Sequence, residues 1–198
     1  MVVSLGDSRL LSLLLEVFLE GPRGAPGVVI LPTDTVYGIH GLAPETGERI
    51  RAIKGRREDR PFITLIPGAA ELEAFLEQPL PEELQALWPG PLTLLAANPQ
   101  GESRAFRAPA DPLLQQLLLH LPRPLYSTSA NRTGIPPLTR FGLILKEFGN
   151  AVDMIVDGGD LRPRPPSTLL DIRQRPYRIL RQGRLEVPAE LLSPQAIR

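Results

Sequence analysis

The chain alternates short apolar runs with segments of helical periodicity over most of its 198 residues. The clearest strand signal is Gly27–Leu31 (GVVIL), an apolar run with β-branched residues that indicates a buried strand. Residues 8–20 present a broad apolar face and end at Gly21-Pro22, which predicts a helix. This alternation favours an α/β or α+β sandwich around one sheet. Because there is no internal repeat or long linker, we expect a single domain over residues 1–198.

Further short segments continue the alternation. Thr46 is placed to cap a helix that runs through Lys54 and stops at Gly55. Other helices are expected near residues 69–78, 81–87, 111–121 and 140–148. Other strands are expected at residues 62–66, 92–97, 105–108, 125–127, 155–156, 168–170 and 177–180. We interpret the Pro-rich stretch Arg162–Pro166 as a loop.

The charged residues balance in number but not in position. There are 22 basic and 22 acidic residues, and the only two Lys are Lys54 and Lys146. Residues 49–60 carry six cations against two acids, and residues 162–184 carry seven Arg against one Asp. Residues 61–103 contain six acids and no Lys or Arg. A neutral total is therefore compatible with a strongly positive local patch, as a polyanionic partner requires.

The composition excludes several classes of protein. With no Cys, the chain has no disulfide scaffold, thiolate zinc site or cysteine nucleophile, and His40 and His120 are too few for a histidine-based metal cage. Walker and G-x-G-x-x-G motifs are absent, so a P-loop or dinucleotide-binding domain loses its main support. No apolar run reaches the roughly 18 residues that span a membrane. The N-terminus lacks a signal-peptide pattern, so we expect a cytoplasmic protein.

Polar segments follow or interrupt apolar strands at four places, where loops present side chains to a ligand. Taken alone, each is typical of an ordinary turn or helix end. Together, their hydroxyl, amide and guanidinium groups match the needs of a polyanion or nucleotide site. The segments are residues 32–38 (PTDTVYG), 54–61 (KGRREDRP), 127–134 (STSANRTG) and 166–168 (PST), the last followed by Arg178 and Arg181.

Seven motifs, in order, resemble the YrdC/YciO family over roughly residues 10–185. They are Leu31–Ile39 (LPTDTVYGI), Ile53–Arg56 (IKGR), Trp88–Thr93 (WPGPLT), Arg107–Pro109 (RAP), Ser129–Asn131 (SAN) with Gly134, Ser167-Thr168, and Leu180–Gly183 (LRQG). The K-x-R and S-x-N motifs together resemble the L-threonylcarbamoyladenylate synthases in particular. The implied fold is an α/β sandwich whose twisted mixed sheet carries a positively charged concave groove.

The resemblance implies a nucleotidyltransferase that condenses L-threonine, bicarbonate and ATP to threonylcarbamoyl-AMP and pyrophosphate. This product leads to N6-threonylcarbamoyladenosine at position 37 of tRNA. ATP is then a substrate, with Mg²⁺ held through its phosphates and no metal site on the protein. The resemblance also implies tRNA or double-stranded RNA as a possible partner, and a downstream threonylcarbamoyl transferase complex as the recipient of the product. No membrane is involved.

The resemblance also implies roles for particular residues. Lys54 and Arg56 match the K-x-R pair and would be catalytic. ATP would contact Arg56, Arg60, Ser103, Ser129, Asn131, Pro137 and Arg181. L-threonine would contact Thr35, Arg107, Ser127 and Ser167. These residue types suit a reaction that needs no covalent nucleophile but must hold small anions together and neutralise developing phosphate charge.

The chain departs from the family pattern in three ways. Many members have His where this chain has Leu65, which alters the threonine pocket, and Arg57 stands where Pro usually follows K-x-R. The sequence stops near residue 198, so we expect no counterpart of the C-terminal domain of longer members.

Two other hypotheses remain open. The groove could bind RNA without catalysis, as a translation-associated factor whose affinity falls steeply with salt. An aromatic content of only 5% argues against single-strand stacking. A YciO-like relative with weak synthase activity is the second hypothesis, and the intact Ser129-Ala-Asn131 motif leans against it.

Overall fold

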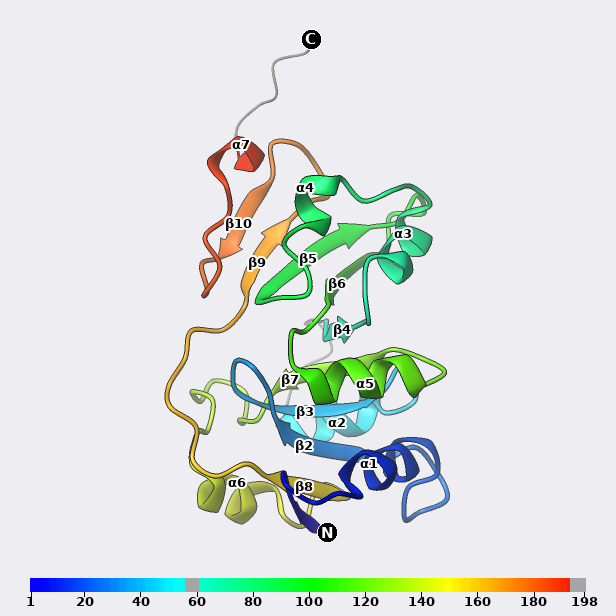
Figure 1. The fold of residues 1–198 in the computed structure, drawn as a ribbon, viewed down its shortest axis with the longest axis vertical. Coiled ribbons are helices and arrows are strands. Elements are labelled where there is room, and N and C mark those ends of the chain that lie inside the picture. Colours follow the sequence, from blue (N-terminus) through cyan, green and yellow to red (C-terminus); the bar gives the residue numbers. More distant parts are fainter. Residues whose placement is uncertain (56–60, 193–198) are drawn as a thin grey trace.

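The chain forms one ten-stranded mixed sheet with helices on both faces (Figure 1), as seen in a computed structural model that describes residues 1–55 and 61–192. The strands are β1 (Val2–Ser4), β2 (Val28–Pro32), β3 (Tyr37–Leu42), β4 (Ile63–Leu65), β5 (Leu92–Ala97), β6 (Ser103–Arg107), β7 (Leu125–Ser129), β8 (Met154–Asp157), β9 (Thr168–Asp171) and β10 (Arg178–Arg181). The helices are α1 (Leu10–Leu19), α2 (Gly47–Lys54), α3 (Ala70–Leu76), α4 (Glu82–Gln85), α5 (Pro112–His120), α6 (Phe141–Phe148) and α7 (Ala189–Leu192).

The strand order in the sheet is β1-β8-β2-β3-β7-β4-β6-β5-β9-β10. The pairs β1/β8, β2/β8, β4/β6 and β5/β9 are parallel, and the remaining neighbours are antiparallel. This order brings distant parts of the sequence together. For example, β7 lies between β3 and β4, although β4, β5 and β6 all precede it in the chain. The predicted fold class, an α/β sandwich with a twisted mixed sheet, is confirmed.

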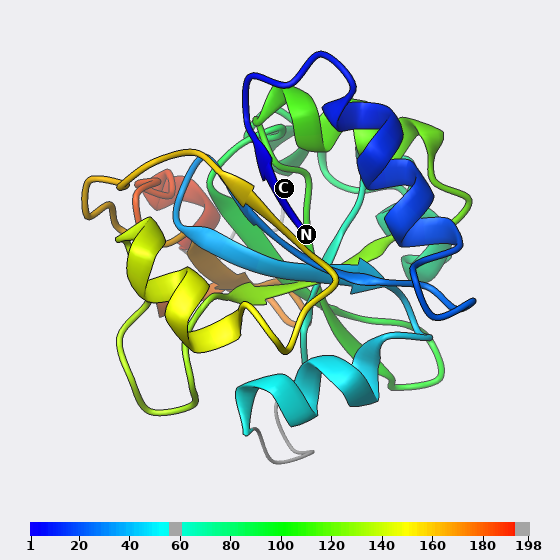
Figure 2. The same cartoon turned by 90° about the horizontal axis from the view of Figure 1, so that it is seen from below.

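Helices cover both faces of the sheet and bury three apolar clusters. Around β2, β3 and β8, α1 and α5 cover one face, whereas α2 and α6 cover the other (Figure 2). A third cluster lies around β5, β6 and β9, where α3, α4 and α7 pack. Because both faces are covered, β2 is buried at every position, which explains why its sequence is a continuous apolar run.

The predicted helices are confirmed, and the one ending at Lys54 stops as expected. Thr46 stands at its start but does not cap it with its side chain, because its hydroxyl donates to the carbonyl of Leu42 (2.9 Å). Gly55 has φ +60°, the left-handed conformation that favours glycine after a helix. Three elements were not predicted, namely β1, β3 and α7. Strand β3 carries Gly38, His40 and Gly41, which weaken the local strand signal, and it forms because β2 and β7 pair with it on either side.

Gly38 on β3 is a position where a side chain has no room. An added Cβ would lie 2.3 Å from Nε2 of His40, whose ring is fully buried. We expect Gly38→Ala to lower the free energy of unfolding by about 1–3 kcal/mol, the usual cost of overpacking. Gly142 in α6 is the matched control, since an added Cβ there meets nothing within 4 Å. Urea unfolding of both variants tests this, and equal stability of the two would contradict it.

Candidate functional site

A cavity of about 950 Å³ lies against one face of the sheet. Its floor comes from β3, β7, β4, β6, β5 and β9, which are consecutive in the strand order. On β4 and β6 every second residue lines it, namely Ile63 and Leu65 on β4 and Ala105 and Arg107 on β6. Alternate residues share a face of a strand, so this face of the sheet is the one that a ligand would meet.

Most of the residues implied by the resemblance line this cavity, although they come from separate parts of the chain. They are Thr35, Lys54, Arg107, Ser127, Ser129, Asn131, Pro137, Ser167 and Arg181. The charged lining residues are all cations in the described part of the chain, with Arg164 added to the predicted set. All four predicted threonine contacts therefore border the same cavity as four of the predicted nucleotide contacts, namely Ser129, Asn131, Pro137 and Arg181.

Lys54 joins the end of α2 to the S-x-N segment, residues 129–131. Its side chain is buried, and Nζ donates to the carbonyl oxygens of Ser129 (2.6 Å) and Asn131 (2.9 Å). Nζ also donates to Oδ1 of Asn131 (3.2 Å), which in turn accepts a hydrogen bond from Oγ of Ser129. The ammonium group therefore positions the S-x-N segment, a role that the sequence did not predict.

The two residues after the S-x-N segment also bind the end of α2, through hydrogen bonds in the opposite direction. Nη1 of Arg132 donates to the carbonyl of Ile53 (2.7 Å), and the backbone N of Thr133 donates to the carbonyl of Lys54 (3.0 Å). These carbonyls belong to the last turn of α2 and have no partner within the helix. The end of α2 and the S-x-N segment thus form one rigid corner of the cavity.

Arg107 is a second, deeply buried cation at the cavity. Its Nη2 donates to Oδ2 of Asp34 (2.6 Å), its Nε to the carbonyl of Gly90 (3.1 Å), and its Nη1 to Oγ1 of Thr35 (3.4 Å). Burial lowers the pKa of Arg107, and the carboxylate of Asp34 partly restores it. Arginine stays charged under such shifts, so the cavity holds a fixed positive group suited to a carboxylate.

Arg181 and Ser167 form a third polar group, reached from β9 and β10. Nε and Nη2 of Arg181 donate to the carbonyl of Ser167 (3.2 and 2.9 Å), and Oγ of Ser167 lies 2.8 Å from Oγ1 of Thr93. Burial lowers the pKa of Arg181, and the positive charge of Arg107 lowers it further. An anion that binds beside Arg181 favours its charged form and so offsets both effects.

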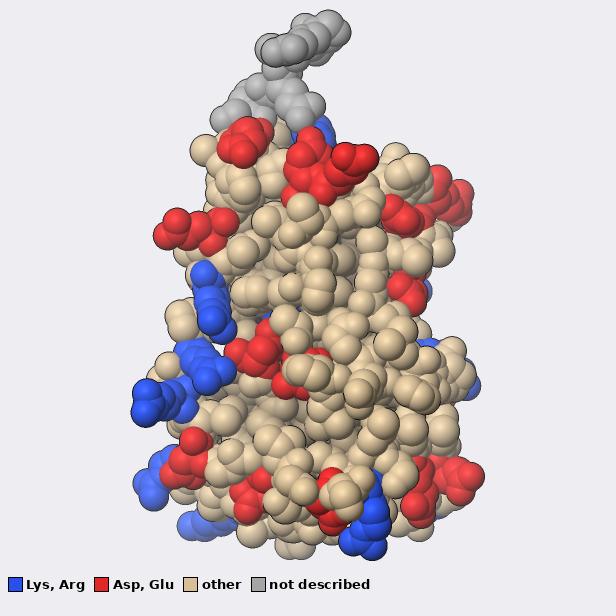
Figure 3. Space-filling view, in the orientation of Figure 1, with Lys and Arg blue, Asp and Glu red and all other residues tan. Residues whose placement is uncertain are grey.

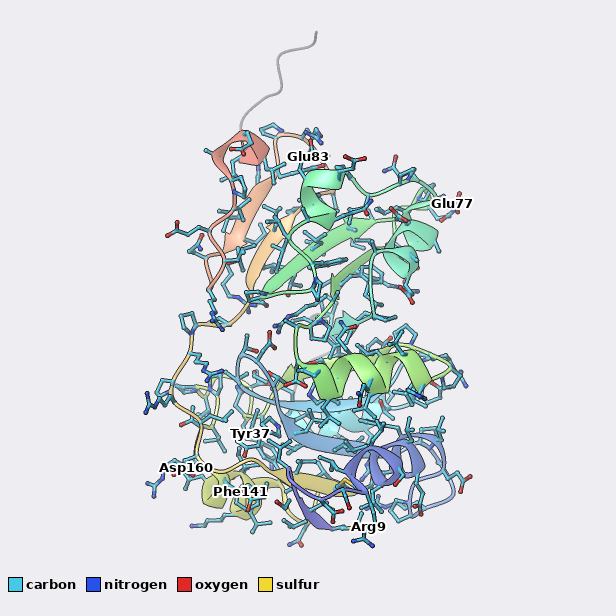
Figure 4. The ribbon with its side chains drawn as sticks, viewed as in Figure 1. Arg9, Tyr37, Glu77, Glu83, Phe141 and Asp160 are labelled. Atoms are coloured by element: carbon cyan, nitrogen blue, oxygen red, sulfur yellow. The ribbon has the colours of Figure 1, made fainter. Side chains whose placement is uncertain are left out.

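The segment from residue 158 to 167, the connecting segment, runs from β8 to β9 along one edge of the molecule (Figure 1). Tyr37 anchors its start, because its hydroxyl donates to the carbonyl of Gly159 (2.8 Å) and accepts from the backbone N of Gly158 (3.0 Å). Asp160 then accepts from the backbone N of Phe141 (2.9 Å) at the start of α6. The two residues lie close together in Figure 4. Lys and Arg gather along this edge, whereas Asp and Glu gather around α3 and α4 (Figure 3).

Three predicted site residues remain, and only Ser103 is within the described part of the chain. Ser103 starts β6 and lies outside the cavity lining, where its Oγ accepts from Nη1 of Arg173 (3.4 Å). Arg56 and Arg60 fall outside the described residues, as does Arg57. Leu65, the departure from the family pattern, does line the cavity, so an apolar side chain replaces a titratable one at that point.

His40 is buried on β3 next to the cavity but does not line it, and it was not predicted as a site residue. It pairs with Ser127 on β7, so both side chains share the cavity face of the sheet. Neither ring nitrogen has a hydrogen-bond partner in the described part of the chain. Burial lowers the pKa of His40 to about 3, and the charge of Arg107 contributes. The ring is therefore neutral at physiological pH.

Residues 1–55 and 61–192 lack both a metal-ligand cluster and a membrane-spanning helix. These residues contain no group of three or more His, Cys, Asp or Glu that could hold a metal ion. None of their helices has both the length and the apolar character needed to cross a membrane.

Known proteins match this chain in sequence. The Sua5/YciO/YrdC family model, described as telomere recombination, matches residues 24–183. The threonylcarbamoyl-AMP synthase of Pyrococcus abyssi is 34% identical over 173 residues, which are 80% of this chain and 51% of that protein. The threonylcarbamoyl-AMP synthase of Nitrosococcus oceani is 34% identical over 163 residues, 74% of this chain and 87% of that protein.

A solved structure matches as well. The crystal structure of P. abyssi Sua5 complexed with L-threonine superposes with a TM-score of 0.77 at 30% sequence identity. The match covers 92% of this chain and 57% of that one. The chain thus spans about half the length of the Pyrococcus relative but most of the length of the Nitrosococcus one.

Proposed function

Because the chain belongs to the Sua5/YciO/YrdC family, we propose that it is a threonylcarbamoyl-AMP synthase. It condenses L-threonine, bicarbonate and ATP to threonylcarbamoyl-AMP and pyrophosphate, which makes it a nucleotidyltransferase. The observation that carries this proposal is the shared cavity, because predicted threonine contacts and predicted nucleotide contacts border the same space. The similarity to proteins named as synthases favours this function over RNA binding without catalysis.

At the threonine side, Arg107 binds the substrate carboxylate, and the hydroxyl groups of Thr35, Ser127 and Ser167 contact the rest of the amino acid. A guanidinium presents paired N–H donors that match a carboxylate. The amine of threonine adds to bicarbonate with loss of water, and this step depends on the two small anions being held together.

At the nucleotide side, the carbamate oxygen attacks the α-phosphate as pyrophosphate leaves. Arg181 neutralises negative charge, and the corner made by Lys54 and the S-x-N segment holds the nucleotide through Ser129 and Asn131. Fixed cations in a partly buried site stabilise such developing charge more strongly than water does. Arg56 and Arg60, with contacts from Ser103 and Pro137, complete the proposed nucleotide set.

Further partners belong to the same proposal. Mg²⁺ enters with ATP and is held through its phosphates. The labile product passes to a threonylcarbamoyl transferase complex that modifies tRNA, and tRNA or double-stranded RNA contacts the positive groove directly. Such a protein acts in the cytoplasm as a single domain over residues 1–198.

The direct test is to incubate the purified protein with ATP, bicarbonate and L-threonine. We expect pyrophosphate release that requires all three substrates, with threonylcarbamoyl-AMP detected by mass spectrometry. Omitting threonine is the internal control and should leave only background release. Salt-sensitive RNA binding without any product would instead favour the RNA-binding hypothesis, and only trace product would favour a YciO-like protein.

A further inference from the structure

Thr93 on β5 carries a hydroxyl group that is fully buried next to the cavity. Thr93 shares a face of the strand with Leu95, which lines the cavity, but does not line it itself. Its Oγ1 lies 2.8 Å from Oγ of Ser167, and this is its one side-chain hydrogen bond in the described part of the chain. Because Ser167 does line the cavity, the hydroxyl of Thr93 reaches a bound ligand through Ser167.

The backbone around Ser167 is held from several sides. Its carbonyl accepts hydrogen bonds from Nε and Nη2 of Arg181 (3.2 and 2.9 Å). The carbonyl of the preceding residue, Pro166, accepts from the backbone N of Arg184 (2.9 Å). Gly183 lies so close that an added Cβ would be 2.4 Å from the carbonyl carbon of Ser167. The serine side chain therefore starts from a fixed point, and what remains to be set is the direction of its O–H.

The direction of the hydrogen bond between the two hydroxyl groups follows from their other partners. Nη2 of Arg181 lies 3.2 Å from Oγ of Ser167, and a guanidinium can only donate. If Ser167 donated to Thr93, the buried hydrogen of Thr93 would have no acceptor among the described residues, which costs free energy. If Thr93 donates instead, it is satisfied, and the two lone pairs of the serine oxygen accept from Thr93 and Arg181. The O–H of Ser167 is then left to donate to a ligand in the cavity.

We propose that Thr93 is a positioning residue, which fixes Ser167 as a hydrogen-bond donor to an anionic oxygen of the bound substrate. This inference rests on the proposed function, since it concerns a hydroxyl group assigned there to substrate binding. Two donors that bind the serine oxygen polarise its O–H and strengthen the bond that this O–H donates. The hydrogen bonds from Arg181 to Ser167 use Nε and Nη2, which leaves Nη1 for the same ligand. A hydroxyl donor beside a guanidinium suits an anionic oxygen.

A double-mutant cycle of threonine-dependent pyrophosphate release tests this role. Thr93→Val keeps the size of the side chain but removes the donor, and we expect kcat/KM for L-threonine to fall about threefold to tenfold, the usual effect of one neutral hydrogen bond. In a Ser167→Ala background the same substitution should change kcat/KM by less than about twofold, because its target is gone. Thr93→Ser restores the hydroxyl group and should keep kcat/KM near the native value, although it loses a buried methyl group.

Thr46→Val is the matched control. It removes a buried hydroxyl that donates to the carbonyl of Leu42, and Thr46 lies outside the cavity lining. Its kcat/KM should equal that of the native protein. The control therefore separates loss of one buried hydroxyl in general from loss of the one that binds Ser167.

The outcomes separate the inference from the proposed function. An equal loss in both backgrounds would mean that Thr93 acts independently of Ser167. An unchanged or increased kcat/KM in Thr93→Val would mean that the donor from Thr93 does not help Ser167 to bind the substrate. Either result overturns the inference while the proposed activity stands. If the native protein shows no threonine-dependent release, the proposed function fails and the inference fails with it. Should Thr93→Val not fold, Thr93→Ala takes its place in the cycle, and the same outcomes decide.

Discussion

Lys54→Met is expected to lower threonine-dependent pyrophosphate release by about a hundredfold to a thousandfold, the range typical of losing one fixed donor in an active site. The variant loses a positive charge from the lining of the cavity, on the side proposed to bind the nucleotide. It also loses the three hydrogen bonds that hold Ser129 and Asn131 against the end of α2. We therefore expect ATP binding to weaken together with turnover, which steady-state kinetics at varied ATP would show.

Lys54→Arg is also expected to lose turnover, although it keeps the positive charge. The acceptors converge on a single nitrogen at 2.6, 2.9 and 3.2 Å, and Lys54 is only 4% exposed. A planar guanidinium is larger and spreads its donors in a fixed fork, so it cannot satisfy acceptors that surround one point. The chain uses Arg for nearly all of its cations, which makes a lysine here notable. Unchanged turnover in Lys54→Arg would show that the choice is incidental.

The control for both variants is Lys146→Met, which removes the other lysine of the chain from an exposed position in α6. It should keep full activity. Circular dichroism separates loss of chemistry from loss of fold, because the apolar contacts that α2 makes through Ile50 and Ile53 remain in the variant. A folded Lys54→Met variant with normal pyrophosphate release would contradict the role given to this residue.

Local sequence patterns predicted the parts of the fold that depend on local chemistry. The helix ending at Lys54 is specified by its neighbours, since Gly55 provides the left-handed residue that ends it. Strand β2 is likewise visible as an apolar run. Strand β3 is not visible in the sequence, because Gly38 and His40 give no strand signal. It forms because it pairs with β2 on one side and β7 on the other. Its first two residues, Tyr37 and Gly38, were therefore included in the polar segment 32–38.

The candidate site also combines features that local motifs predict with contacts between distant residues that they do not. Motifs predicted which residues matter, and the structure brings most of them to one cavity, although their contacts with ligands stay predictions. What the motifs could not reveal are pairs that form only in three dimensions. Asp34 and Arg107 are 73 positions apart, and Lys54 reaches Ser129 across 75. Arg164 was missed because a Pro-rich stretch carries no periodic signal, although its seven-arginine neighbourhood marked the region as basic.

His40 is expected to make this protein sensitive to acid. Its ordinary pKa of 6.5 applies in the unfolded chain, whereas burial lowers the pKa to about 3 in the folded protein. Below pH 6.5 the unfolded chain therefore binds a proton that the folded protein does not. Above pH 6.5, His40 does not lower the free energy of unfolding through proton binding. As the pH falls from 6.5 towards 3, proton binding to the unfolded chain lowers the free energy of unfolding. Below pH 3 both states bind the proton, so this loss does not grow further. Each pH unit in this window costs about 1.4 kcal/mol, or about 4–5 kcal/mol in total.

His40→Leu isolates this effect, because leucine fits a buried apolar site and does not titrate. At pH 7 the two proteins should have similar free energies of unfolding, since the neutral ring makes no hydrogen bond in the described structure. At pH 5 the variant should be more stable by about 2 kcal/mol, the proton-linked loss that the native protein alone suffers. His120→Gln, at an exposed position, should follow the native protein throughout. Urea unfolding from pH 7 to pH 4 measures the difference, and parallel curves for native and His40→Leu proteins would mean that His40 is protonated equally in both states.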